Sequence, residues 1–438
     1  MPITAVLPSR NVQWLAGLLF GAGALQWLAL PAGSDGFRVW ILSAWSVASL
    51  VVALVLAWEW HWLRIGLSVF AATLVLGWTR GLGSPAASTH FAGASLGLLW
   101  MAIVGRQAVT PGRLTLGLLL FLGVAAMALV VGMAGVPAFF PPDTYSVVTG
   151  DLSILRRALI SAEATEVNQN ALAALALLVC PVAASSVWLR GQPRAQQLLL
   201  QAFGAVVFLG GAWILMVTRS RTALLAAWLL LLVVLVRGCR WWVWRMLTGA
   251  LAAAIPLAGL GWIYQVPRER VLDAVGRLYY ILQDRMHILL FAAQTWADNL
   301  WLGIGLNEFR HVYAASHGLG DITAHAHNVF LQIGLDVGLI GLIAYCAVFG
   351  LLLVRADQAS RGPIAIARTA AAGSAFSLIA VHLFGLADAV SLGAKIGVLQ
   401  WMAGGLILGS WRMQHATEAA PDTVLPDRSN GAPARTVG

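Results

Sequence analysis

Long apolar stretches, separated mostly by short polar connections, form the main pattern of this chain. A transmembrane helix needs about 20 mainly apolar residues to cross roughly 30 Å of hydrocarbon. Twelve stretches meet that need, and because the fourth and eighth are short, eleven or thirteen spans also fit. The predicted spans centre on 12–31, 37–57, 62–79, 90–105, 114–134, 170–189, 198–217, 222–236, 243–264, 328–354, 367–387 and 392–411. We therefore expect an all-α integral membrane protein with about 12 transmembrane helices.

The composition agrees with this pattern. Hydrophobic residues make up 60% of the 438 residues, charged residues only 10%, and the mean hydropathy is +0.81. Soluble domains carry about 25% charged residues, so a water-soluble fold is excluded. The three cysteines, Cys180, Cys239 and Cys346, show no paired spacing, and neither a disulfide framework nor a cysteine metal site is expected.

The net charge of +9 acts as a topology signal. Lys and Arg concentrate in short cytoplasmic connections, whereas acidic residues influence orientation little. With twelve spans and both ends inside, one face carries fifteen arginines against five acids, and the opposite face carries twelve of each sign. Both termini are therefore predicted to be cytoplasmic. The basic residues form no patch of the kind that binds nucleic acid.

Most connections between the predicted spans are short, but two are long, and they divide the chain into regions. Residues 1–264 are expected to hold spans one to nine, with an outer loop near 135–169. A large outer loop at 265–327 contains GRLYYILQDRMHILLFAAQTWADNL, whose apolar positions recur at helical spacing and predict amphipathic helices. Residues 328–411 hold the last three spans, and the polar tail at 412–438 is expected to be a disordered cytoplasmic segment.

Arginines stand out at two places on the predicted outer face. Arg219 and Arg221 occupy an abrupt turn between two very apolar spans. Planar guanidinium groups there suit a diphosphate, although contact with lipid headgroups also explains them. Arg277 and Arg285 lie in the amphipathic segment and add positive charge above the same region, unless surface salt bridges such as one to Asp284 occupy them.

A histidine pair precedes the tenth span. His325 and His327 lie just before Asn328, which is expected to cap that helix. Histidine titrates near neutral pH and is the usual general base, whereas an ordinary interfacial histidine is the plainer interpretation. No carboxylate cluster is evident beside the pair, so no metal site is predicted.

Two further pairs of polar residues belong to the same face. Asp388 and Lys395 lie between the last two spans, seven residues apart, and would share a face if the segment is helical; a structural ion pair is the alternative. Asn168 and Asn170 precede the sixth span and suit either hydrogen bonding to a sugar or phosphate, or a helix cap.

Taken together, these motifs resemble the O-antigen ligases, within a wider group that includes O-antigen polymerases and membrane O-oligosaccharyltransferases. The resemblance covers roughly residues 165–345. It rests on NQNALA at the start of a span, the SRTALLA turn, and the run from DRMHILLFAAQTWADNLWLGIGLNEF through HAHNVFLQIGLDVGLIGL. It separates ligase from polymerase less well than it identifies the group.

The resemblance implies a GT-C-like glycosyltransferase of lipopolysaccharide biosynthesis in the bacterial inner membrane. Such an enzyme moves O-antigen from undecaprenyl diphosphate to a sugar hydroxyl of lipid A-core at the periplasmic face, without a cofactor or metal. His327 matches the family's essential histidine, Arg221 the arginine of its Ser-Arg turn, and Arg285 the arginine that opens the amphipathic segment. Arg219 is an additional arginine. The expected supporting residues are His325, Asn168, Asn170, Arg277, Asp388 and Lys395.

Other functions are alternatives to this interpretation. A polymerase would use the same donor with a second lipid-linked glycan as acceptor, and a protein O-oligosaccharyltransferase would use a protein. A lipid or polysaccharide transporter would also place charges at membrane depth. Transporters tend to show repeated halves and broken helices near the midplane. Here no internal repeat is visible, and the unusual polar groups gather at one face.

Overall fold

The structure is a computed structural model that describes residues 36–58, 60–81, 84–134, 169–190, 192–218, 220–238, 268–317, 325–389 and 395–418. Its regular elements are all helices, and no strand occurs among these residues. In chain order they are α2 Gly36–Ala57, α3 His61–Arg80, α4 Pro85–Gln107, α5 Pro111–Ala134, α7 Gln169–Val187, α8 Arg194–Val217, α9 Arg221–Gly238, α11 Arg268–Asp298, α12 Phe309–His317, α13 Val329–Arg361, α14 Ala365–Gly385 and α15 Lys395–Glu418.

Eight helices are long and apolar enough to cross a bilayer by themselves: α2, α3, α4, α5, α7, α8, α13 and α14. Ten of the twelve predicted spans coincide with helices of the structure, and the two at 12–31 and 243–264 lie outside the described residues. Large apolar side chains such as Ile65, Val206 and Leu209 remain exposed on the helix flanks. Exposed apolar surface of this extent suits lipid and not water, so the chain is a multi-pass membrane protein.

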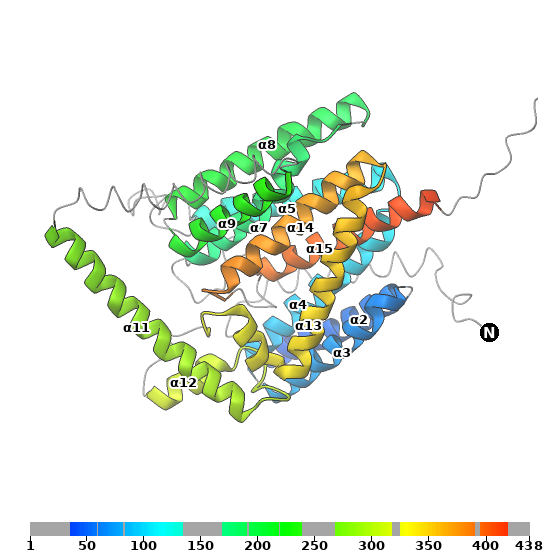
Figure 1. Cartoon of the computed structure of the whole chain (residues 1–438). Coiled ribbons are helices and arrows are strands. Elements are labelled where there is room, and N and C mark those ends of the chain that lie inside the picture. The colour runs from blue at the N-terminus through cyan, green and yellow to red at the C-terminus, as the bar shows by residue number, and fades with distance from the viewer. Residues whose placement is uncertain are drawn as a thin grey trace, which may run out of the picture.

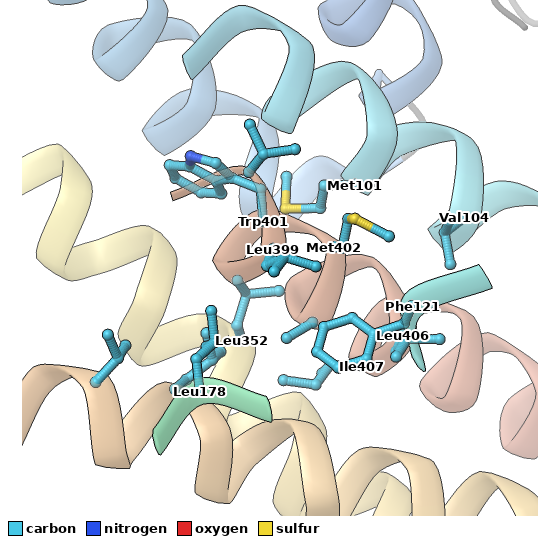
Figure 2. Close-up of a cluster of buried hydrophobic side chains, with 14 of the residues drawn as sticks. Met101, Val104, Phe121, Leu178, Leu352, Leu399, Trp401, Met402, Leu406 and Ile407 are labelled. Carbon is cyan, nitrogen blue, oxygen red and sulfur yellow. The ribbon is translucent and has the colours of Figure 1, made fainter. Parts of the chain in front are cut away.

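The helices form one bundle in which α15 packs along α4, while α11 and α12 lie together beside one end (Figure 1). Figure 2 shows Trp401 and Met402 of α15 packed near Met101 of α4. Close approach depends on a small residue, because a Cβ atom on Gly405 would lie 3.0 Å from the Cα of Met101. Small residues serve the same purpose in other membrane helix pairs.

A kink divides α13 at Gly338, whose φ of 73° is in the left-handed region that favours glycine. An unbroken helix would join the Leu339 N–H to the Leu335 carbonyl. Here the Leu339 N–H donates to the Leu300 carbonyl at 2.8 Å, and the Leu335 carbonyl accepts from the Ile304 N–H at 2.7 Å. Residues 299–308, which we call the wedge turn, therefore satisfy both backbone groups that the kink releases.

The wedge turn also contacts α3. The Leu306 N–H donates to the Gly77 carbonyl at 3.1 Å, and the Arg80 guanidinium donates to the Gly303 carbonyl. The turn thus joins the connection between α11 and α12 to two helices of the bundle. The segment 265–327 was predicted to contain amphipathic helices, and in the part that the structure describes it forms α11 and α12.

Candidate functional site

One end of the bundle brings the candidate residues together. Asn328 at the start of α13 donates through Nδ2 to the Leu386 carbonyl after α14, at 3.0 Å. α5 begins beside the late part of α15, where Gly409 meets Ala108, and it ends beside the start of α7, where Gly132 meets Leu172. α14 also begins beside the late part of α15, since the Ile364 N–H donates to Gln414 Oε1. The start of α7 therefore lies at the end of the bundle where α14 ends. We call this end, where α7, α9 and α13 begin and α14 ends, the site end.

A His–Asp cluster lies at the site end. His325 Nε2 is 3.4 Å and His327 Nδ1 is 3.5 Å from the same atom, Oδ1 of Asp388. The two imidazole rings are edge to face, with centroids 4.4 Å apart. The Asp388 side chain is only 3% exposed, whereas the two histidine side chains are about one-fifth exposed. The carboxylate is therefore covered, and the rings form the accessible surface of the cluster.

The backbone around His327 is held in an unusual conformation. Its φ of 53° is left-handed, which is uncommon for a residue with a side chain. The His327 N–H donates to His325 Nδ1 at 3.2 Å. Asn328 caps α13 as predicted, since its Oδ1 accepts from the N–H groups of Phe330 and Leu331, each at 3.0 Å.

Burial and neighbouring charges set the protonation of the cluster. Burial lowers the pKa of His325 to about 4, with contributions from His327 and Arg285 against the opposing attraction of Asp388. Burial alone would raise the pKa of Asp388, but His327, His325 and the Ala389 N–H stabilise its carboxylate and bring the pKa below its ordinary value. At neutral pH the cluster therefore holds a neutral His325 beside an ionised Asp388.

Arg285 lies next to this cluster. From α11 its Nη1 donates to the carbonyl of Ala387 at 3.2 Å, one residue before Asp388. The contact brings a guanidinium from the amphipathic helix to the edge of the His–Asp cluster. An anionic group of a ligand bound there would meet both a hydrogen-bond donor and a positive charge.

The start of α9 occupies the site end as well. Ser220 caps α9, with its Oγ accepting from the Ala223 N–H at 3.4 Å, and the same hydroxyl donates to Asn170 Oδ1 at 2.8 Å. Asn170 therefore bonds to the turn before α9. The sequence had suggested a ligand contact or a helix cap for this residue, and this contact is neither. Arg221 follows as the first residue of α9, where its positive charge adds to that of the helix N-terminus.

The structure does not describe the side chains of the remaining predicted residues. Arg219 and Asn168 lie outside the described residues. Arg277 belongs to α11 and Lys395 begins α15, and only their backbone positions are described. Their predicted roles stay predictions.

Sequence reasoning misjudged Asp388 in two ways. It considered a helix shared with Lys395, but α14 ends at Gly385 and Asp388 lies in the turn that follows. It also found no carboxylate cluster beside the histidines and did not place Asp388 there, whereas Asp388 contacts both. The signal was present, because both segments flank spans at the same predicted face, but 61 positions along the chain separate the groups and hide their contact.

The three side chains of the cluster also place their ligand atoms close enough together to hold a metal ion. One ligand atom each from His325, His327 and Asp388 lie within 4.8 Å of one another. Two imidazoles and a carboxylate are a ligand set that zinc accepts. The same atoms make the His–Asp contacts already described, so the geometry suits either a hydrogen-bonded cluster or an ion.

Comparison with known proteins places part of the chain in a known family. No curated protein matches the chain. A family model described as O-antigen ligase matches residues 204–346. The matched region includes Arg221, Arg285, His325 and His327, whereas Asp388 comes from beyond it. The predicted resemblance to the O-antigen ligase family is thereby confirmed for residues 204–346.

Proposed function

We propose that the protein is an O-antigen ligase that transfers O-antigen polysaccharide from undecaprenyl diphosphate to a sugar hydroxyl of lipid A-core. One observation carries the proposal. Two histidines of a segment that matches the O-antigen ligase family share one buried carboxylate, with an arginine beside it. That combination supplies a base, its orienting anion and a partner for a departing diphosphate.

His327 acts as the general base. Its Nδ1 faces Asp388, which leaves Nε2 as the nitrogen that can accept a proton from the acceptor hydroxyl. Asp388 orients the ring and stabilises the imidazolium that forms, in the manner of the aspartate in a catalytic triad. Base catalysis of this kind contributes about 10²- to 10⁴-fold.

The transfer step is a direct displacement. The acceptor oxygen forms a bond to the anomeric carbon while the bond from that carbon to the diphosphate oxygen breaks. The electron pair leaves with undecaprenyl diphosphate, the proton goes to His327, and the anomeric centre is inverted. Arg221 and Arg285 stabilise the charge that develops on the diphosphate, together with Arg219. Because arginines serve that role, the transfer is proposed to need no divalent metal.

The site end faces the periplasm, and both chain termini are cytoplasmic. This orientation is supported by the excess of arginine on the opposite face of the predicted topology. The donor and acceptor lipids would then meet at the outer surface of the inner membrane. Residues 265–327, which include both histidines of the cluster, would lie outside.

A reconstituted assay tests the proposal. Purified protein in lipid nanodiscs receives undecaprenyl-diphosphate-linked O-antigen and lipid A-core, in excess EDTA, and the products are separated on a gel. The expected product is a ladder attached to lipid A-core. Donor chains joined to one another would identify a polymerase instead, a modified protein acceptor would identify a protein O-oligosaccharyltransferase, and movement of intact donor across the membrane would identify a transporter. Activity lost in EDTA and restored by magnesium, manganese or zinc would refute the metal-independent step.

A further inference from the structure

The left-handed backbone conformation of His327 must be stabilised by neighbouring residues. A residue with a side chain in the left-handed region persists only where the surrounding structure fixes it. Among the described residues, only two that are not glycine have a positive φ, His327 at 53° and Asn307 at 57°. These two residues belong to different segments, and a chain of hydrogen bonds runs from Ala326, the residue before His327, to Asn307.

Gln332 forms the first half of that chain. It lies in the first part of α13, is 2% exposed, and uses both ends of its amide. Its Oε1 accepts from the N–H of Ala326, the residue before His327, at 2.9 Å. Its Nε2 donates to Oδ1 of Asp336 at 2.9 Å. The amide therefore holds the His segment against the helix that follows.

Asp336 forms the second half. Its side chain lies one helical turn after Gln332 and is 1% exposed. Oδ1 accepts from the N–H of Asn307 at 3.1 Å in addition to the Gln332 amide. Asn307 is part of the wedge turn, which fills the kink at Gly338. The chain thus couples the His segment to the kink and the wedge turn.

Such a pair is costly in an apolar helix. A buried amide and carboxylate lose their hydration, and a leucine at either place would bury apolar surface instead. Their hydrogen bonds reach backbone groups on two separate segments, and each of these segments has a strained residue. The arrangement fits a fixing device better than general packing.

We propose that Gln332 and Asp336 are positioning residues, which fix the 325–327 segment against the wedge turn so that His327 is held in its reactive orientation. The inference rests on the proposed role of His327 as the base. Neither residue touches substrate. Their effect on transfer passes through the Ala326 N–H and the backbone of His327.

The principal test is Gln332→Met, which keeps the length of the side chain and removes both hydrogen bonds. Turnover per folded molecule is expected to fall about 10- to 100-fold, since small displacements of a catalytic group have effects of this size. Donor affinity should stay within about twofold, because the base acts in the transition state. Asp336→Asn keeps an acceptor oxygen, and its turnover should stay within roughly fivefold of the wild type.

Gln414→Met is the matched control. Gln414 is also 2% exposed and also bonds to backbone on both sides, accepting from the Ile364 N–H and donating to the carbonyls of Ala359 and Ile364 at the far end of α13. The variant should lose stability but keep turnover per folded molecule. An equal loss of turnover in Gln332→Met and Gln414→Met would show a merely structural role and overturn the inference.

The double variant Gln332→Glu/Asp336→Asn tests the inference independently, in case Gln332→Met does not fold. It keeps the net charge, an acceptor for the Ala326 N–H and a donor–acceptor contact between positions 332 and 336. Its turnover should recover to within about tenfold of the wild type. Turnover as low as in His327→Ala would overturn the inference.

His327→Ala measured beside these variants separates the two proposals. An inactive His327→Ala with a fully active Gln332→Met overturns only the positioning role. An active His327→Ala overturns the proposed base, and the positioning role fails with it.

Discussion

Two groups of polar residues that contain histidine, one within the helix bundle around His382 and one beside the ends of α13 and α14, differ in how their polar atoms are used. In the core, His382 Nε2 contacts Tyr345 Oη at 2.9 Å, and His382 Nδ1 contacts the Leu378 carbonyl at 2.6 Å. Gln400 Nε2 donates to the same Tyr345 hydroxyl at 2.7 Å. Both nitrogens of His382 therefore have neutral partners within the protein.

The cluster at the site end is different in each respect. Its partner is a carboxylate, its rings are about one-fifth exposed, and His327 has a ring nitrogen that faces away from Asp388. Buried polar groups with complete partners stabilise a structure. A base needs one unoccupied nitrogen and a partner that favours its charged form. The comparison shows why a histidine inside a membrane bundle is a candidate base only where its partners leave a nitrogen accessible.

The largest expected effect is a loss of turnover that occurs when a histidine is replaced in one cluster and not in the other. His327→Ala should lower turnover about 10²- to 10⁴-fold while donor binding stays largely intact, because the base acts in the transition state. His382→Ala should lower the thermal stability and leave turnover per folded molecule near normal. Turnover and donor affinity of both variants are measured in nanodiscs. Near-normal turnover in His327→Ala, or an equal loss in both variants, would contradict the comparison.

The second effect concerns the carboxylate. Asp388→Asn removes the charge that favours the imidazolium and should lower turnover roughly 10²-fold, with donor affinity unchanged. Asp357→Asn is the control, because Asp357 lies near the far end of α13, where its carboxylate pairs with Arg361. If Asp388→Asn retained wild-type turnover, the base would not need its carboxylate.

The third effect concerns donor binding. Arg221→Ala and Arg285→Ala should each raise the donor dissociation constant about tenfold, since hydrogen bonds to charged groups contribute about 1.5–3 kcal/mol and Arg285 is partly exposed. Arg113→Ala, at the opposite end of the bundle, should leave the constant unchanged. Binding is measured with labelled donor lipid. Arginine variants that lose turnover without losing affinity would move these residues from binding to catalysis alone.

Much of this arrangement follows from the sequence, and the exceptions have a physical cause. Apolar length predicted α2 and α9 closely, because a helix is the conformation that satisfies its own backbone in lipid. The histidine motif and the Asn328 cap were local signals and were found. The contact of Asp388 with the histidines and the wedge turn at Gly338 depend on tertiary packing, and neither has a local pattern.

The smallest effect is a pH dependence of stability. Because the pKa of His325 is lowered to about 4 in the folded protein from an ordinary 6.5, the unfolded chain binds more protons between these values. Stability is therefore lost as the pH falls from 6.5 towards 4. His325→Gln should reduce the drop in the unfolding midpoint between pH 7 and pH 4.5 by a few °C, roughly, and lower turnover only a few-fold.

Thermal scans at pH 8, 7 and 4.5 check this expectation. The wild type and His325→Gln should behave alike between pH 8 and pH 7 and differ below that range. An equal loss of stability in both proteins at pH 4.5 would assign the acid sensitivity to other groups.

The kink at Gly338 also decides how much of α13 the bilayer has to accommodate. At 1.5 Å per residue the whole helix would measure about 50 Å, well beyond the roughly 30 Å of hydrocarbon. Residues 339–361 alone extend for roughly 35 Å, enough to cross with a modest tilt. The short segment before Gly338 is then not needed for the crossing. A crossing by residues 339–361 alone would place Gln332 and Asp336 beyond the hydrocarbon, at the depth at which the proposed donor would hold its diphosphate.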